Sequence, residues 1–160
     1  MEASSASGSS PSPTGVRQTA LELLQAALRA VEAKDLPAVL ALLDDDSTLI
    51  DPHYPVPRMV GRAAITDGLR WAFGTIVTFR FELDLAYESA DRRHAAVEVD
   101  CHHVLRGGRA LEFRQVFVAD AQGGTISRLQ AYEPYGPGGL VGLVLKVTRL
   151  GRRLRRQGRR

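Results

Sequence analysis

The hydrophobic pattern of the chain changes its period near residue 79, and this change limits the possible folds more than any other feature. Over residues 21–31 apolar side chains recur every three or four positions, which is the spacing of a helix with one buried face. Over residues 79–87 apolar and polar side chains alternate, which is typical of a half-buried strand. Helices followed by alternating strands predict an α+β protein, with helices packed on one face of a curved antiparallel sheet.

Three helices are predicted, all in the first half of the chain. The first covers residues 21–31, and the second begins after Asp35, an N-cap residue, with Pro37 in its first turn. The third covers residues 61–73 and is expected to end at Gly74.

Five strands are predicted, at residues 48–51, 79–87, 94–105, 109–119 and 125–133. Gly107 and Gly108 form a candidate two-residue hairpin turn between the third and fourth of these strands. That turn places Arg106 opposite Arg109 and thereby fixes which side chains share a face.

With this register, one face of the hairpin combines acidic, imidazole and aromatic side chains: Asp100, His102, Phe113, Gln115 and Phe117. Aromatic walls with a few polar groups are typical of a ligand pocket. A longer turn or a bulge would exchange the two faces and bring His103 beside Gln115 instead. Both registers remain open here, as does the hypothesis that Asp100 and His102 lie on a solvated face.

The charge of the chain is unevenly distributed. The net charge is +3, but eight of the 21 basic residues lie within 146–160, which leaves 13 basic against 18 acidic residues elsewhere. We therefore predict no specific nucleic-acid binding by the folded part. Residues 137–160 are predicted to form a basic amphipathic extension, which either binds an anionic membrane or acidic partner or packs on the domain.

Composition and missing motifs predict the extent of the folded domain, its location and its cofactors. Residues 1–14 are small, polar and rich in proline, and are predicted to be disordered, which leaves residues 15–136 as the folded domain. A single cysteine, Cys101, excludes an internal disulfide. Together with the absence of a secretory signal, it predicts a cytoplasmic protein that the tail could hold at a membrane surface. Motifs for a phosphate loop, a zinc site or a nucleophile elbow are missing, so we predict neither cofactor nor metal.

Three short motifs carry a resemblance to a known family. They are Leu49-Ile50-Asp51-Pro52, then Gly61-Arg62-Ala63-Ala64-Ile65, and finally Gln130-Ala131-Tyr132. In this order and spacing, over roughly residues 19–133, the chain resembles the ketosteroid isomerases and SnoaL-like polyketide cyclases of the NTF2-like superfamily. The resemblance implies a cone-shaped NTF2-like (cystatin-like) fold with an internal apolar pocket, and a homodimer formed through the sheet.

The resemblance also implies roles for individual residues. Asp51 matches the general base of the isomerases, whereas Ala27 and Gln115 stand where that family has its tyrosine and protonated aspartic acid. The positions of Asp100, His102 and Glu133 line the family's pocket.

These residues predict a function of proton-transfer type. We expect Asp51, helped by His102 and Asp100, to act on a small apolar ligand whose carbonyl oxygen is held by Gln115. Trp71 and Tyr54 are candidates for the pocket mouth. The prediction is a cofactor-independent polyketide cyclase or isomerase; a non-catalytic binding module and an epoxide-hydrolase-like enzyme are the alternatives.

Overall fold

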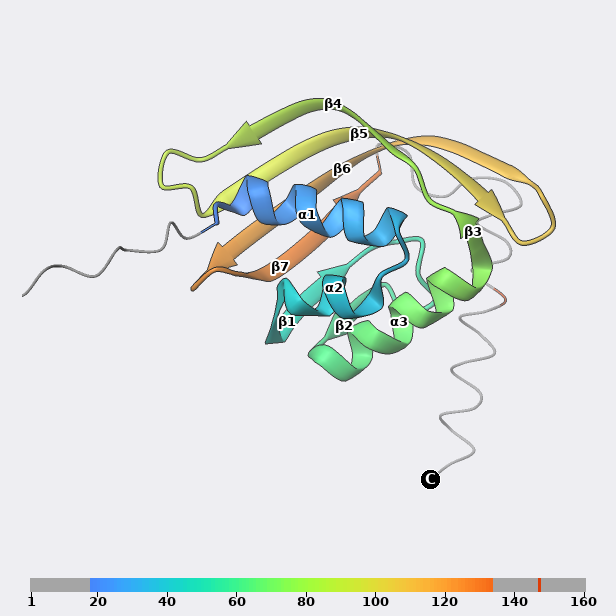
Figure 1. Cartoon of the computed structure of the whole chain (residues 1–160), viewed down its shortest axis with the longest axis horizontal. Coiled ribbons are helices and arrows are strands. Elements are labelled where there is room, and N and C mark those ends of the chain that lie inside the picture. Colours follow the sequence, from blue (N-terminus) through green and yellow to red (C-terminus); the bar gives the residue numbers. More distant parts are fainter. Residues whose placement is uncertain (1–17, 134–146, 148–160) are drawn as a thin grey trace, which may run out of the picture.

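The computed structural model describes residues 18–133 and Val147, and in this part of the chain three helices pack on one curved sheet (Figure 1). The helices are α1 (Ala20–Glu32), α2 (Leu36–Ala41) and α3 (Arg62–Thr75). The strands are β1 (Leu43–Ile50), β2 (Arg58–Val60), β3 (Ile76–Thr78), β4 (Phe81–Glu88), β5 (His94–Leu105), β6 (Ala110–Gln122) and β7 (Thr125–Tyr132). The predicted disordered segment 1–14 and nearly all of the predicted basic extension 137–160 lie outside the described residues.

The first helix begins with a complete capping box. The hydroxyl of Thr19 accepts from the backbone N–H of Glu22, and the Glu22 carboxylate accepts from the backbone N–H of Thr19. These two bonds satisfy donors that a helix end otherwise leaves free. The helical spacing of its leucines then places Leu23, Leu24 and Leu28 in the core, where α1 packs across β4, β5, β6 and β7.

The second helix also begins where the sequence predicts. The Asp35 side chain accepts from the backbone N–H of Ala38 at 3.0 Å, and Pro37 occupies the first turn. An Asp at this position satisfies an orphan N–H, and proline there removes a donor that would have no partner. The predicted N-cap is confirmed.

The sheet is mixed rather than wholly antiparallel, so the antiparallel prediction is wrong in one pairing. Its strand order is β2-β1-β7-β6-β5-β3, and β4 pairs with β5 beside β3. β1 runs parallel to β7, whereas the other pairs are antiparallel. The parallel pair forms because the chain leaves β1 for β2 and α3 before the meander begins, and returns through β7 to pair with β1. Irregular pairing along β1, β3, β4 and β6 accompanies the bend of the sheet around α1 (Figure 1).

Several predicted boundaries are wrong. β1 begins at Leu43, five residues before the predicted start at residue 48, and includes the acidic run 44–46. Gly74 lies inside α3, which ends one residue later, and the short strand β2 was not predicted. Pairing with neighbouring strands outweighs the low strand preference of the three acidic residues, and helix packing outweighs the low helix preference of Gly74. Both local preferences therefore gave wrong boundaries.

The β5–β6 hairpin adopts the alternative register. Leu105 donates its N–H to the carbonyl of Arg109 at 2.8 Å, so the loop holds three residues, 106–108. Gly107 and Gly108 have φ values of 111° and 84°, which a side chain would disfavour. Each residue therefore pairs one position away from the two-residue prediction; for example Cys101 pairs with Phe113 and His103 with Leu111. The predicted register is wrong, and the faces exchange.

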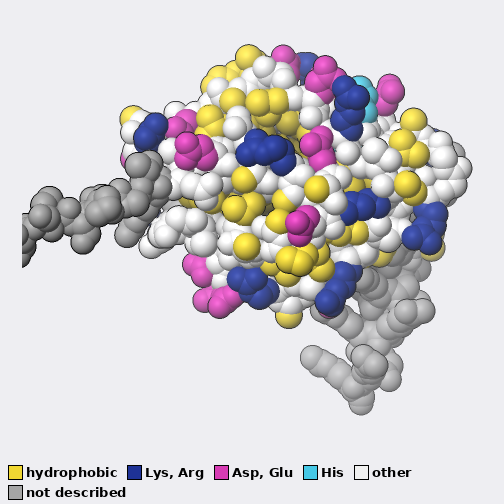
Figure 2. Space-filling model, viewed as in Figure 1, with side chains coloured by type: hydrophobic (Ala, Val, Ile, Leu, Met, Phe, Trp, Pro, Cys, Tyr) yellow, Lys and Arg dark blue, Asp and Glu magenta, His cyan; other side chains and the backbone are white. Residues whose placement is uncertain are grey.

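Charged groups are mixed on the face shown in Figure 2, where lysines and arginines lie between acidic side chains and hydrophobic ones. Such interspersed charges largely neutralise one another locally. Among the described helices, none combines the length and apolar character needed to cross a bilayer.

Gly68 tests the close packing of α3 on the loop that follows β1. A Cβ at this position would lie 2.1 Å from Sδ of buried Met59 and 3.3 Å from Tyr54. We expect Gly68→Ala to lower the free energy of unfolding by about 1–2 kcal/mol, because the overlap outweighs the gain in helix propensity.

Gly74 provides the matched control in the same helix, since a Cβ there would meet nothing within 4 Å. We expect Gly74→Ala to raise the free energy of unfolding by about 0.5–1 kcal/mol. Urea titrations of the two variants measure both values, and equal effects would show that the packing at Gly68 is loose.

Candidate functional site

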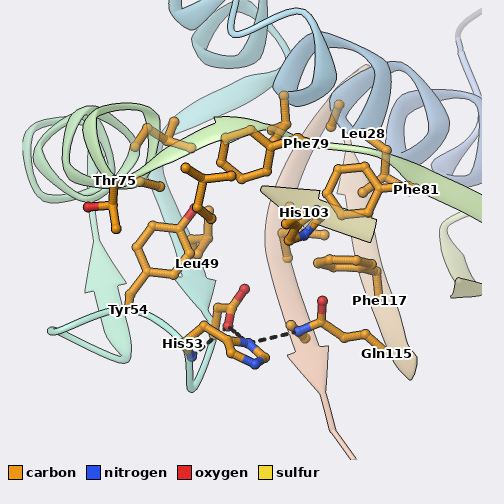
Figure 3. A pocket seen from close by; sticks show the side chains of 18 of the residues that line it. Leu28, Leu49, His53, Tyr54, Thr75, Phe79, Phe81, His103, Gln115 and Phe117 are labelled. Atoms are coloured by element: carbon orange, nitrogen blue, oxygen red, sulfur yellow. Dashed lines mark hydrogen bonds and ion pairs between the residues drawn. The ribbon is translucent and has the colours of Figure 1, made fainter. Parts of the chain in front are cut away.

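A cavity of about 190 Å³ lies between the helices and the concave face of the sheet (Figure 3). Its walls are mostly aliphatic and aromatic: they include Leu28, Leu49, Leu69, Phe79, Phe81 and Phe117. Few polar side chains reach this wall, and among them are Asp51, His53, His103 and Gln115. Water is largely excluded from such surroundings, so each of these polar groups must find a partner in the protein or in a ligand.

The first polar group is built by the turn that follows β1. Asp51 comes directly after the strand, and Pro52 turns the chain so that His53 folds back over it. One carboxylate oxygen of Asp51, Oδ1, accepts from the backbone N–H of His53 at 2.8 Å and lies 3.0 Å from Nδ1 of the ring. This local turn fixes the imidazole against the carboxylate.

The opposite side of the imidazole meets a second carboxylate. Nε2 of His53 lies 2.8 Å from Oε1 of Glu133, which follows β7 at the end of the described domain. The other oxygen of Glu133, Oε2, is buried with no hydrogen-bond partner among residues 18–133. Since the two ring nitrogens point in opposite directions, His53 bridges Asp51 and Glu133.

The bridge determines the charge of His53. Burial opposes a charge on the ring, but the hydrogen bonds and negative charges of Asp51 and Glu133 outweigh burial and raise the pKa of His53 above its ordinary value of 6.5. When the ring is protonated, both nitrogens donate, one to Asp51 and the other to Glu133.

Gln115 lies next to this bridge on the inner face of β6. Its side chain is buried, and its amide nitrogen lies 3.4 Å from Nδ1 of His53 (Figure 3). The thiol of Cys101 donates to the amide oxygen at 3.7 Å. Burial raises the pKa of that thiol, so Cys101 remains protonated and serves as a packing partner, not a nucleophile.

The exchanged register brings His103, not His102, into the cavity. His103 is 5% exposed and lies among the rings of Phe79, Phe81 and Phe113. Burial lowers the pKa of His103 to about 4, so this imidazole is neutral near pH 7.

Asp100 and His102, predicted as catalytic residues, lie on the outer face of the sheet. Asp100 accepts from the Arg114 guanidinium at 3.0 Å, and this hydrogen bond lowers the pKa of the carboxyl. His102 is 42% exposed and lies 3.7 Å from Glu82. Their expected place beside Gln115 is wrong because side chains alternate along a strand, so a shift of one position moves both to the other face.

The other predicted site residues lie at or beside the cavity. Phe113, Phe117, Trp71 and Tyr54 line it with Asp51 and Gln115, and Glu133 contacts it through His53. Sequence reasoning missed His53. The available signal was a histidine two residues after the matched aspartate, in a loop bracketed by prolines that turn the chain back on itself.

No metal site follows from these residues. Asp51 and Glu133 lie on opposite edges of the His53 ring, so the three side chains do not converge on one point. Within the described ranges, no group of three His, Cys, Asp or Glu side chains could hold a metal ion.

Comparison with known proteins identifies the family. The family model of the SnoaL-like domain matches residues 24–129. This chain belongs to the SnoaL-like domain family. The predicted resemblance to SnoaL-like and ketosteroid-isomerase-like proteins of the NTF2-like superfamily is confirmed. No curated protein matches in sequence.

Solved structures similar to this SnoaL-like protein share its fold at low sequence identity. A proposed polyketide cyclase from Pseudomonas putida KT2440 is 23% identical, with a TM-score of 0.66 over 74% of this chain and 93% of the other. The protein Rv0760c of Mycobacterium tuberculosis, in complex with estradiol-17β-hemisuccinate, is 22% identical, with a TM-score of 0.66 over 74% and 96%. The Δ5-3-ketosteroid isomerase of a Mycobacterium species is 22% identical, with a TM-score of 0.65 over 72% and 93%.

The two inner imidazoles should titrate in opposite directions from an ordinary histidine. We expect His53 to remain protonated above pH 6.5, and His103 to remain neutral down to about pH 4. In Asp51→Asn the pKa of His53 should fall, because the variant loses the negative charge beside Nδ1. Histidine ring resonances followed by NMR between pH 4 and 9 measure these values.

The same shift makes a prediction for stability. Because folding raises the pKa of His53, the contribution of this side chain to the free energy of unfolding is fully present below pH 6.5 and is lost as the pH rises through the folded-state pKa.

In the NMR titration, an unchanged His53 pKa in Asp51→Asn would contradict the bridge, and Asp100→Asn on the outer face serves as the control.

Proposed function

We propose that this protein is a cofactor-independent enzyme that moves a proton within a small apolar ketone, as an isomerase or a polyketide cyclase does. The observation that carries the proposal is the Asp51–His53 pair, a carboxylate and an imidazole joined at 3.0 Å in the wall of an apolar cavity. Asp51 is the base, and the imidazole beside it, whose pKa the two carboxylates raise, stabilises the negative charge that develops during the reaction.

The two oxygens of Asp51 have different surroundings, which supports its role as a base. Oδ1 is occupied by the backbone N–H and the ring of His53. Oδ2 makes no hydrogen bond to another described residue, and the side chain lines the cavity. A carboxylate fixed through one oxygen can use the other to accept a proton from a ligand carbon.

The proposed step balances within the ligand and Asp51. Oδ2 removes a proton from the carbon next to the carbonyl, and the C–H electrons form a C=C bond while the carbonyl becomes an enolate. Gln115, which is buried beside His53, donates its amide N–H to the enolate oxygen. In an isomerase Asp51 then returns the proton to another carbon. In a cyclase the enolate carbon attacks a second carbonyl, a C–C bond forms, and the resulting alkoxide takes the proton back from Asp51.

A non-catalytic ligand-binding module is the second candidate, and one observation favours it. Ala27, which stands where the ketosteroid isomerases have a tyrosine, lies in the cavity wall and offers no hydrogen-bond donor. An enolate here therefore has fewer donors than in that family.

A variant of Asp51 separates the two candidates. We expect Asp51→Asn to slow conversion of a β,γ-unsaturated polycyclic ketone to its α,β-unsaturated isomer by about 10²–10⁴-fold, because the amide cannot accept the proton. The ultraviolet absorption of the conjugated product follows the reaction.

Asp100→Asn is the matched control, since it removes a carboxylate on the outer face, and its rate should equal that of the wild type. Binding of the ketone with no conversion by the wild type would favour the binding module. Equal rates of conversion by the wild type and Asp51→Asn would contradict the role of Asp51 as the base.

The proposal includes a homodimer formed through the outer face of the sheet. Leu85, Glu98, Val116 and Tyr132 form one cross-strand row from β4 to β7. Leu85 and Tyr132 are 46% and 48% exposed, which is high for large hydrophobic side chains. A second copy would cover this row.

A charge placed in that row tests the dimer. We expect Val116→Arg to convert a dimer into a monomer in light scattering after size exclusion, because the cation would be buried in the interface. Val60→Arg, at an exposed position on β2, is the control and should remain dimeric. A wild-type monomer would contradict the proposal.

A further inference from the structure

His103 is a buried polar side chain of the cavity for which the proposed reaction has no use. It projects from the inner face of β5 and lines the same cavity as Asp51 and His53. Its ring lies near those of Phe79 and Phe81 (Figure 3). The centroid of the ring is 5.1 Å from that of Phe79, 5.1 Å from that of Phe81 and 5.5 Å from that of Phe113. A histidine is a costly way to fill an aromatic cluster unless its nitrogens are used.

The surroundings determine which nitrogen carries the proton. The backbone N–H of Arg80 points to Nδ1 at 3.4 Å, so Nδ1 acts as an acceptor and carries no hydrogen. The ring is neutral near pH 7, because burial lowers its pKa to about 4. The single ring proton is therefore on Nε2.

The Nε2–H group has no protein acceptor in the described part of the chain. Within residues 18–133 the hydrogen bond of this ring is the one that Nδ1 accepts, and the ring lines the cavity, where Nε2–H can reach a ligand. Nε2–H of His103 is therefore a neutral donor available for a hydrogen bond to a ligand.

We propose that His103 donates a hydrogen bond from Nε2 to an oxygen of the ligand, so the pocket selects an apolar ring system with two oxygen functions. One is the carbonyl that reacts at Asp51 and His53, and the other is a ketone or hydroxyl held by His103. The position of the first oxygen rests on the function proposed above, whereas the second rests on His103 itself.

The spacing of the two sites indicates an elongated ligand. His103 pairs with Leu111, and Gln115 lies four residues further along β6. The backbone position opposite His103 is therefore about 13 Å along the strand from Gln115. Phe113 lies between them in sequence, and its ring contacts both His53, at 4.7 Å, and His103, at 5.5 Å between centroids. A flat apolar body along this ring, with an oxygen near each end, matches the arrangement.

The test compares ketones that share one ring system. The probes are 5α-androstane-3,17-dione, 5α-androstan-3-one and 5α-androstan-17-one, and quenching of Trp71, the single tryptophan and a cavity residue, reports binding. We expect the wild type to bind the dione about tenfold more tightly than the monoketone that lacks the oxygen held by His103. A factor of this size corresponds to the loss of one hydrogen bond. In His103→Phe, which keeps the aromatic volume and loses the donor, this preference should disappear.

His102→Phe is the matched control, because it changes the adjacent residue on the outer face, and it should keep the preference. A preference that survives in His103→Phe, or equal binding of all three ketones by the wild type, would overturn the proposal. Failure of every ketone to bind would overturn both this inference and the proposed function. A dione preference in a protein that does not isomerise ketones would support the role of His103 while removing that of Asp51.

A measurement on the wild type remains decisive if His103→Phe does not fold. In ¹⁵N-labelled protein, long-range histidine correlations should show the Nε2–H tautomer of His103, and its Nε2 resonance should shift when the dione saturates the pocket. The Nδ1–H tautomer, or a resonance that does not respond to bound dione, would overturn the proposal.

Discussion

The pairing of β5 with β6 is the interaction on which the site depends. These two strands are long neighbours within the sheet, and every residue from His94 to Val104 has a partner on β6. Side chains alternate between faces, so the number of residues in the connecting loop determines which of them enter the cavity. The three-residue loop directs Cys101, His103, Phe113 and Gln115 inward, and leaves Asp100 and Arg114 to pair on the outside.

The same cavity holds two histidines whose pKa values shift in opposite directions. His53 lies between two carboxylates, which outweigh the cost of burial and raise the pKa of the ring. His103 has aromatic neighbours and a backbone N–H, so burial dominates and the ring stays neutral. The intrinsic chemistry of the two side chains is identical, and the neighbours alone separate them.

Fold and site answer different questions for this SnoaL-like protein. The family match and the structural similarities establish the scaffold, and proteins with that scaffold perform many functions. The specific features of this chain are the Asp51–His53–Glu133 bridge, neutral His103, and Ala27 in place of a donor. The bridge and His103, rather than the fold, support a proton-transfer reaction on a ligand with two oxygen functions, whereas Ala27 favours a binding module.

The sequence by itself determined the elements and one catalytic candidate. Helical spacing with its capping residues located α1 and α2, and period-two alternation located β5 and β7, because these signals are local. The Asp-Pro step likewise marked Asp51. Tertiary structure decided the rest: hairpin register chose His103 over His102, and chain folding brought Glu133 to a ring 80 positions away. One additional residue in the hairpin loop changes which side chains of the two strands share a face, and a contact between distant segments has no periodic pattern in the sequence. Local sequence patterns therefore predicted neither the register nor the contact of Glu133 with His53.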